Sequence, residues 1–345
     1  MSEVKDDFSV AGDRKVLYRK AGKRRLFTDP DPDRAREFFR DKSRSLEDKL
    51  TTVSQAVSNL ISDGDYLGVG GFGSNRIPTA LLHEILRQEK KGLGFAGHTS
   101  THDMQILVAG DCIDRCDVAY IVGLEARGLS PGAREAFESG RIEATEWTNA
   151  ALAWRYRAAA MGVSFLPVRM MMGTETLDYS AGVEIPCPFT DQKYVAVPAL
   201  YPEVALIHVH RSDRYGNAQI EGITVSDLDL ARAAKRVIIT AEEIIPTEEV
   251  RRQPDRNMIP YFLVDAVIEV PYGAYPSNMA YHYFSDEEHL QEWLEAERDA
   301  SNFQAFLEKN IYGVKDHAEY IEVNGGLKRL QRLRSEENIG SYQEQ

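Results

Sequence analysis

Short apolar segments alternate with helical segments through the first half of this chain, and this alternation limits the possible folds more than any other feature. YLGVGGFG (66–73), GLGFAG (92–97) and VAYIVGL (118–124) are typical of buried strands. PTALLHEILRQ (78–88) and MQILVAGD (104–111) lie between them and have helical periodicity. Because neighbouring parallel strands need crossover connections, the order predicts an α/β fold with an open, mostly parallel sheet flanked by helices.

The second half continues the pattern and ends in charged helices. Residues 150–161 and 227–236 read as helices, and further β runs are predicted at 164–173, 193–200, 204–210, 236–245 and 262–274. A turn at Asp213 to Gly216 predicts a return strand after 204–210. Beyond Tyr283 we expect a helical C-terminal layer. We divide the chain into a charged N-terminal extension (1–50), one domain (51–325) and a polar tail (326–345).

Composition excludes several classes of function. With 41 Lys+Arg against 54 Asp+Glu, the formal charge is −13, which argues against a nucleic-acid partner because phosphate contacts need clustered basic residues. No apolar run reaches the roughly 18 residues of a membrane span, so no membrane partner is expected. Three cysteines, Cys112, Cys116 and Cys187, form no disulfide framework. We expect a cytoplasmic protein with reduced, buried thiols.

The segment GDYLGVGGFGSNRIP (64–78) carries the strongest functional signal. Glycines let backbone N–H groups approach a ligand closely, and a following helix start favours negative charge, so an anion or carboxylate site is plausible. Gly68, Gly70 and Gly73 also satisfy a dinucleotide GxGxxG pattern, but the next strand ends in His98-Thr99-Ser100 instead of an acidic residue. A tight strand-to-helix turn without a ligand is the remaining alternative.

The sequences of several segments, and their order along the chain, resemble those of one protein family. GDYLGVGGFGSNRIP resembles the glycine-rich signature of the A subunit of family I CoA-transferases, closest to glutaconate CoA-transferase. Further matches in register are AAAMGVSFLPVR, EVALIHVHRSDRYGNAQIEG, AAKRVIITAEEIIPTEEVRRQPDRNMIP and VDAVIEVPYGAYPS. The resemblance covers about residues 54–325 and implies a CoA-transferase-type fold.

The resemblance also implies a chemistry and a partner. In this family a glutamate carboxylate attacks an acyl-CoA thioester and then carries CoA as an enzyme thioester. That glutamate lies in the B subunit, and this chain has no segment similar to its SENG-type signature. We therefore expect no catalytic nucleophile in this chain and a hetero-oligomer with a B subunit, α2β2 or larger. Acyl-CoA and a carboxylic acid are the expected substrates, with no cofactor and no metal.

The expected substrate-binding residues follow two predicted strands: Gly70, Gly71, Phe72, Gly73, Ser74, Asn75 and Arg76 after the first, and His98 and Thr99 after the second. Arg76 matches an arginine suited to binding the far carboxylate of a dicarboxylic acyl group through two parallel hydrogen bonds. Ser74 and Asn75 are further donors. This role predicts that Arg76→Ala loses more rate on dicarboxylic than on monocarboxylic substrates.

Other conspicuous residues favour structural roles. His208 and His210 face the same side of a predicted strand, as two metal ligands would, but no third ligand is evident, and we interpret them as structural or pocket-lining. We expect capping or supporting roles for His98 and His102 rather than catalysis. Cys112 and Cys116 could share a helical face and are expected to be small buried hydrophobes. Met170, Met171 and Met172 are expected in the core or a pocket wall.

Two departures from the glutaconate enzyme leave the substrate open. Glu125 directly follows the predicted strand at 118–124 and could act as a base, although a salt bridge with Arg127 is the simpler interpretation. In the ring-opening hydrolase branch the essential glutamate belongs to the segment matching 146–150, where this chain has Asn149. This departure favours transfer over hydrolysis. A hydrolase or decarboxylase of a dicarboxylyl-CoA ester, and a non-catalytic acyl-CoA-binding subunit, are the alternatives.

Overall fold

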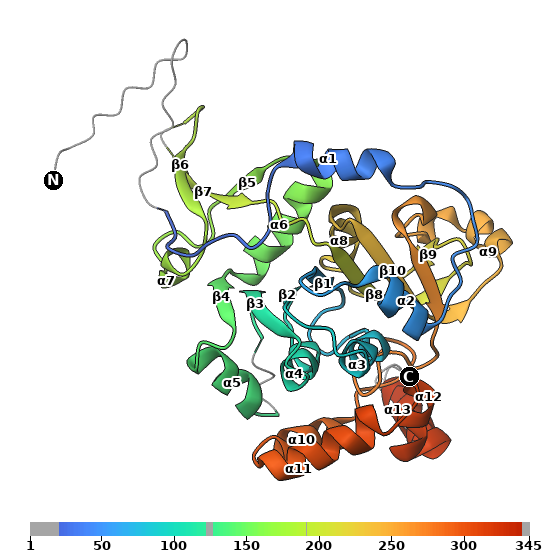
Figure 1. Cartoon of the computed structure of the whole chain (residues 1–345). Helices are drawn as coiled ribbons and strands as arrows, with labels where there is room; N and C mark the ends of the chain where they lie inside the picture. Colours follow the sequence, from blue (N-terminus) through green and yellow to red (C-terminus); the bar gives the residue numbers. More distant parts are fainter. Residues whose placement is uncertain (1–20, 122–126, 191, 340–345) are drawn as a thin grey trace.

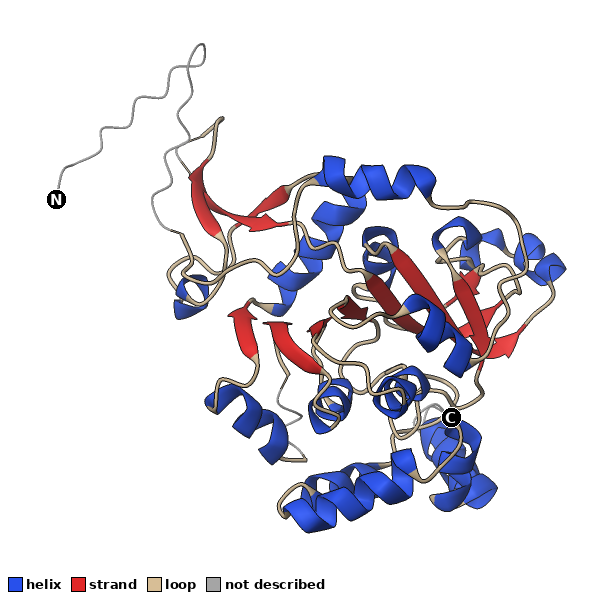
Figure 2. Cartoon of the chain, viewed as in Figure 1, coloured by secondary structure: helices blue, strands red, loops and turns tan. Residues whose placement is uncertain are grey.

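A large, mostly parallel sheet forms the centre of the molecule (Figures 1 and 2). The structure is a computed structural model that describes residues 21–121, 127–190 and 192–339. The strands follow the spatial order β11-β10-β8-β1-β2-β3-β4, every neighbouring pair is parallel, and β9 pairs antiparallel with β8. Their bounds are β1 Tyr66–Val69, β2 Leu93–Gly97, β3 Ile113–Val118, β4 Glu143–Glu146, β8 Val204–Ser212, β9 Ala218–Gln219, β10 Arg236–Ile244 and β11 Ala266–Glu269.

Helices cover both faces of this sheet, which explains why its central strands are apolar on both sides. In β8, Val204 and Leu206 point into one core, and Ala205, Ile207 and Val209 point into the other. The first core contains residues of α2 Val53–Leu60, α3 Thr79–Arg87, α4 His102–Ala109 and α5 Pro131–Glu138. The second contains residues of α1 Pro32–Asp41, α6 Asn149–Met161 and α8 Asp227–Ala233. The predicted fold class is confirmed.

The strand order reverses direction at β1, and this places the site. From β1 the chain proceeds through β2, β3 and β4 on one side, whereas β8, β10 and β11 follow on the other. In open α/β sheets, ligands bind outside the carboxyl ends of the strands at such a reversal. The residues that leave β1 and β2 at this edge are the glycine-rich segment 70–76 and the segment 98–101.

The third strand lies earlier in the chain than the sequence predicts. The prediction was a strand at 118–124 and a shared helical face for Cys112 and Cys116, but β3 is Ile113–Val118, Cys112 precedes it and Cys116 lies within it. Residues 122–124 of the predicted strand lie outside the described residues. The charged sequence IDRCDV does not look like a buried strand. In the structure it is buried at Ile113, Cys116 and Asp117 only. The Asp117 carboxylate can be buried because it accepts hydrogen bonds from Tyr66, Trp147 and Arg155, at 2.6, 2.6 and 2.5 Å. The expected burial of Cys112 and Cys116 is confirmed, whereas Cys187 is only partly buried.

A small antiparallel sheet extends from the second core. Its order is β5-β7-β6, with bounds β5 Phe165–Val168, β6 Val183–Pro186 and β7 Lys193–Pro198, and α7 Glu175–Asp178 lies between β5 and β6 in sequence. Met171 is buried in the second core, and Met170 and Met172 pack against it. The predicted core position of these methionines is confirmed.

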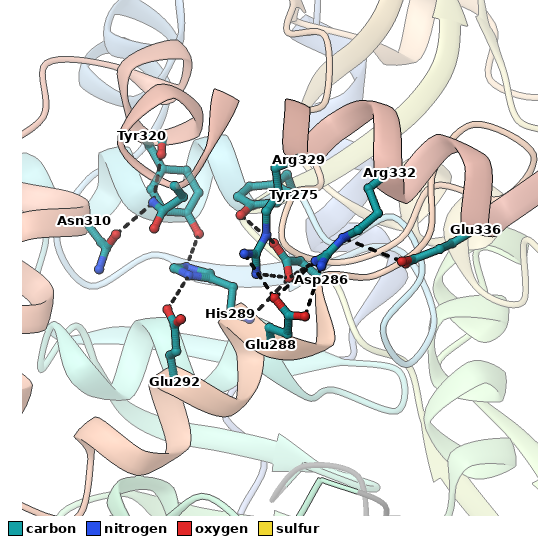
Figure 3. A network of polar contacts seen from close by, with 11 residues as sticks. Tyr275, Asp286, Glu288, His289, Glu292, Asn310, Tyr320, Arg329, Arg332 and Glu336 are labelled. Atoms are coloured by element: carbon teal, nitrogen blue, oxygen red, sulfur yellow. Dashed lines mark hydrogen bonds and ion pairs between the residues drawn. The ribbon is translucent and has the colours of Figure 1, made fainter. Parts of the chain in front are cut away.

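The predicted C-terminal helical layer is also confirmed, and it packs against α3 and α4. Trp293, Leu307 and Ile311 belong to the first core. Figure 3 shows how the layer is closed: Arg329 donates two hydrogen bonds of 2.5 Å to the buried carboxylate of Asp286, which also accepts one from Tyr275 at 2.8 Å. The layer comprises α10 Glu287–Ala296, α11 Ala300–Leu307, η3 Glu308–Tyr312, α12 His317–Val323 and α13 Gly326–Ile339.

The segment before α2 lies along the β11 edge. Lys42 donates to the carboxylate of Asp265 at 2.7 Å, and Leu50 forms a parallel bridge with Val267. The remaining short helices between β10 and β11 are α9 Thr247–Arg252, η1 Pro254–Arg256 and η2 Tyr261–Leu263. None of the helices within the described ranges combines the length and apolar character needed to cross a bilayer.

Candidate active site

The glycine-rich segment forms a tight loop at the carboxyl end of β1. The backbone N–H groups of Phe72 and Asn75 each donate to the other residue's carbonyl oxygen at 3.0 Å. Gly71, Gly73 and Arg76 have positive φ values of 88°, 62° and 62°. A β-carbon on Gly71 would lie 2.5 Å from the carbonyl oxygen of Asn75, so this turn requires glycine there.

A second segment holds the loop from outside. Arg76 N–H donates to the carbonyl oxygen of Asn278 at 2.8 Å, and Asn278 N–H donates to that of Ser74 at 2.9 Å. The side-chain oxygen of Asn75 accepts from the Asn278 side chain and from Ala280 N–H, both at 3.3 Å. The Asn75 side chain is therefore engaged within the protein.

The tip of the loop presents two adjacent backbone donors. The N–H groups of Gly73 and Ser74 donate to no group within the described ranges. A β-carbon built on Gly73 would meet no atom within 4 Å, so the space beside it is open. Two consecutive free N–H groups suit an oxyanion or a carboxylate.

The segment after β2 lies against this loop. The hydroxyl of Thr101 donates to the carbonyl oxygen of Gly73 at 3.0 Å, and the rings of Phe72 and His98 have centroids 5.3 Å apart. Thr99 has a φ of 54°, an unusual value for a β-branched residue. The structure thus brings together the two groups of residues predicted from the sequence, 70–76 and 98–99.

Only one of the two ring nitrogens of His98 has a hydrogen-bond partner among the described residues. Its Nε2 lies 2.8 Å from the carbonyl oxygen of Asn149, so Nε2 carries the proton. Burial lowers the pKa of His98, only partly offset by this hydrogen bond. Its Nδ1 therefore presents a lone pair, and Nδ1, the Thr99 hydroxyl and the Asn149 side-chain oxygen have no hydrogen-bond partner in the part of the chain that the structure describes.

A family model described as "Coenzyme A transferase" matches residues 50–270, which span this whole edge of the sheet. The chain belongs to the coenzyme A transferase family.

Relatives within the family include the A subunits of two CoA-transferases. That of the glutaconate CoA-transferase of Acidaminococcus fermentans is 32% identical over 311 residues, covering 85% of this chain and 97% of its own length. That of the 3-oxoadipate CoA-transferase of Pseudomonas knackmussii is 33% identical over 282 residues, with 79% and 96% covered. The crystal structure of the Acidaminococcus enzyme matches with a TM-score of 0.78, covering 83% of this chain and 95% of that one. The resemblance inferred from the sequence is confirmed.

Other members of the family catalyse different reactions. The cholesterol ring-cleaving hydrolase IpdA subunit of Mycobacterium tuberculosis is 30% identical over 294 residues, covering 82% of this chain and all of its own length. The crystal structure of a variant of the decarboxylase AibA/AibB matches with a TM-score of 0.67 and 32% identity, covering 75% of this chain and 98% of that one. Family membership alone therefore leaves the reaction open.

Arg76 is the family-loop residue whose position differs most from expectation. Its side chain is fully buried, and its guanidinium pairs with Asp227, with Nη2 2.7 Å from Oδ2 and Nη1 3.2 Å from Oδ1. Nη2 also donates to the carbonyl oxygen of Ile223 at 2.7 Å. Its predicted contact with a substrate carboxylate stays a prediction.

The other histidines lie in internal networks. His208 has partners at both ring nitrogens, Thr240 and Glu242, each at 2.8 Å. Nε2 of His210 lies 2.9 Å from the carbonyl oxygen of Ala280, and its Nδ1 accepts from Glu221 N–H at 3.0 Å. His102 lies in α4, where burial lowers its pKa to about 3. Among the described residues, no group of three or more His, Cys, Asp or Glu side chains could hold a metal.

Sequence reasoning missed three residues that shape the site: Asp227, Thr101 and Asn278. Asp227 begins a short helix, where an acidic residue is ordinary, so nothing in SDLDLARAAK distinguishes it. Thr101 and Asn278 act through contacts over 28 and 203 residues of sequence. Glu125, which the sequence suggested as a base, lies outside the described residues.

Proposed function

We propose that this chain is the A subunit of a heteromeric CoA-transferase, which moves CoA between an acyl-CoA and a carboxylic acid in the cytoplasm. A partner B subunit supplies the glutamate that carries CoA. The observation that carries the proposal is the pair of free N–H groups of Gly73 and Ser74, in the loop at the carboxyl edge of the sheet whose Phe72 ring packs against His98. The two relatives from CoA-transferases support the choice of reaction.

The reaction needs an oxyanion site more than it needs a base. The partner's glutamate oxygen bonds to the thioester carbonyl carbon and the C–S bond breaks. CoA departs as a thiolate, and an acyl-glutamyl anhydride remains on the enzyme. The thiolate then bonds to the glutamyl carbonyl carbon and releases the donor acid as a carboxylate, and the same steps in reverse load the acceptor. Each attack places negative charge on a carbonyl oxygen, which two preorganised N–H groups stabilise.

The finer part of the proposal is a dicarboxylic acyl group. By their names, two transferase relatives act on glutaconate and 3-oxoadipate. Because the charge of Arg76 is balanced by Asp227 and the free N–H groups of the loop serve the carbonyl oxygen, we propose that a neutral donor outside the loop, the unpartnered hydroxyl of Thr99, binds the second carboxylate in this chain.

The decisive experiment traps the covalent intermediate. We would purify the chain with its partner, incubate the pair with glutaryl-CoA, butyryl-CoA or acetyl-CoA, and add borohydride, which reduces an enzyme-CoA thioester. Inactivation that depends on acyl-CoA, with CoA exchange into an added acid, is the expected result. Neither trapping nor exchange with any of the three would refute the transferase, and exchange by the chain alone would refute the need for a partner.

A hydrolase or decarboxylase is the second candidate, favoured by the hydrolase relative and the decarboxylase structure. The same incubations separate it from transfer, because hydrolysis releases free CoA without an acceptor and decarboxylation releases CO₂ with the thioester intact. Binding without turnover would instead indicate a non-catalytic acyl-CoA-binding subunit.

A further inference from the structure

We propose that Asp227 is a positioning residue, which holds the glycine-rich loop in the conformation that directs its free N–H groups at the substrate. The inference rests on the proposed function, since it assigns a role within that site. Asp227 lies at the start of α8, far from the loop in sequence, and its side chain is fully buried.

One carboxylate binds both ends of the loop. Oδ1 of Asp227 accepts from Gly71 N–H at 2.9 Å and from Nη1 of Arg76 at 3.2 Å, while Oδ2 accepts from Nη2 of Arg76 at 2.7 Å. Gly71 and Arg76 are two of the three residues in the loop with positive φ. For Arg76 this conformation costs about 1 kcal/mol or more, so it persists only where surrounding contacts enforce it.

The sequence of the loop makes room for this carboxylate. A β-carbon on Gly70 would lie 2.6 Å from Oδ1 of Asp227, so any larger residue would displace the acid. Nη1 of Arg76 also lies 3.3 Å from the carbonyl oxygen of His208 in β8, as a long hydrogen bond. The Arg76–Asp227 pair therefore connects the loop to the sheet and to α8.

The Arg76–Asp227 ion pair also determines which hydrogen-bond donors of the loop are free to bind a ligand. The guanidinium is surrounded by Asp227 and two carbonyl oxygens, so its charge is balanced inside the protein. The groups that remain available at the tip are the neutral N–H donors of Gly73 and Ser74. Asp227 should therefore matter equally for every acyl-CoA, whatever the charge at the far end of the acyl group.

The test compares two buried aspartates. Asp227→Asn keeps the size of the side chain but removes its charge, and Asp117→Asn makes the same change in the Asp117–Arg155 pair, whose side chains are equally buried. The hydrogen bonds of the Asp117 carboxylate go to Tyr66, Trp147 and Arg155, none of which belongs to the loop. Each variant would be assayed with the partner subunit, using glutaryl-CoA and butyryl-CoA as donors and acetate as acceptor.

We expect Asp227→Asn to lower kcat about 100-fold on both donors, the size of effect seen when an oxyanion donor is lost, with KM changed about threefold or less. Hydrogen exchange of the peptide spanning 70–76 should accelerate. Asp117→Asn should lower the unfolding midpoint while kcat of the folded enzyme and exchange at 70–76 stay near wild type. A structural defect alone would not separate kcat from KM in this way.

Three results would overturn the inference. They are unchanged exchange at 70–76 in Asp227→Asn, a kcat no lower than in Asp117→Asn, or a loss in Arg76→Ala confined to glutaryl-CoA, which would assign Arg76 to the substrate instead. If Asp227→Asn does not fold, Arg76→Lys tests the same pair, since it keeps the charge but loses the paired contacts. If the wild-type pair transfers no CoA, the proposed function fails, and hydrogen exchange still decides whether Asp227 holds the loop.

Discussion

Two groups of polar side chains lie beside the glycine-rich loop, and they differ in how completely their hydrogen bonds are formed. In the closed cluster (His208, Thr240, Glu242 and Tyr283), both nitrogens of His208 have partners, and Glu242 also accepts from Tyr283 at 2.6 Å. In the open cluster (His98, Thr99 and Asn149), each residue keeps a buried polar atom without a partner inside the described ranges. Buried polar groups are nearly always paired in folded proteins, so the open cluster needs an explanation.

In the proposed function, we interpret the fully paired His208 as holding the fold and His98, with its unpaired Nδ1, as facing a ligand. A closed cluster gains stability from each member and loses it when one is removed. An open cluster costs stability, and such costs concentrate at functional sites. Both clusters are built around a buried histidine, although His208 lies within β8 and His98 directly follows β2. Residue type therefore does not distinguish the clusters, whereas the hydrogen-bond partners do.

The largest expected effect is the removal of Glu242 from the closed cluster. Glu242→Ala leaves His208 and Tyr283 without an acceptor in a buried site, and we expect a loss of about 3–5 kcal/mol in the free energy of unfolding. Burial acts to raise the pKa of Glu242, but hydrogen bonds from His208 and Tyr283 outweigh it and hold the pKa below its ordinary value. Urea unfolding at pH 7 measures the loss.

Glu243→Ala is the matched control, because Glu243 is the next residue and is exposed. We expect its free energy of unfolding to stay within about 0.5 kcal/mol of wild type. Equal effects of the two substitutions would show that the closed cluster contributes nothing to stability, and the contrast between the two clusters would fail.

Replacing Asp103, which is next to the open cluster, should raise the free energy of unfolding by an amount that depends on pH. Burial raises its pKa to about 6, partly offset by hydrogen bonds from backbone N–H groups, including that of Thr101 at 2.7 Å. Above pH 6 the folded protein bears the full cost of the buried charge, and below about 4 the acid is protonated in both states and the cost is absent. This group therefore reduces stability as pH rises from about 4 to 6.

Asp103→Asn removes that cost and keeps an oxygen that can accept from Thr101. We expect the free energy of unfolding to rise by about 1–3 kcal/mol at pH 7.5 and to change little at pH 4. Urea unfolding at the two pH values measures both. A loss at pH 7.5 would mean that the ionised carboxylate stabilises the segment after β2.

The sequence predicted the sheet, the helical layers and the loop because these depend on apolar periodicity and on glycine, which are local signals. It misplaced β3 because the burial of Asp117 depends on Arg155 and Trp147, 38 and 30 residues away. It identified Arg76 but not the Asp227 carboxylate that pairs with it 151 residues later. The partners of a buried charge are set by tertiary contacts, which no local pattern records.

His98 should matter more for activity than for stability. His98→Leu removes the contact with Asn149 and the free lone pair of Nδ1, so we expect a loss of about 1 kcal/mol in unfolding free energy and about a tenfold loss in kcat/KM with glutaryl-CoA. His102→Leu is the control for destabilisation, because His102 is also buried, with Nδ1 paired with Gln105 in α4 and Nε2 without a partner inside the described ranges. If both variants lose the same activity, the open cluster has no specific role.

Thr99→Gly gives the smallest expected change in stability. Glycine tolerates the φ of 54° and relieves about 1 kcal/mol or more of strain, but it loses about 0.5–1 kcal/mol in backbone entropy on folding, so the unfolding midpoint should hardly move. The variant also removes the unpartnered hydroxyl. If that hydroxyl contacts substrate, kcat/KM with glutaryl-CoA falls severalfold in a protein of unchanged stability, whereas Thr99→Ser, which keeps the hydroxyl, retains most of it. An active Thr99→Gly enzyme would leave His98 and Asn149 as the ligand-facing members of the open cluster, and would mean that the strain at residue 99 serves only to direct the backbone between β2 and α4.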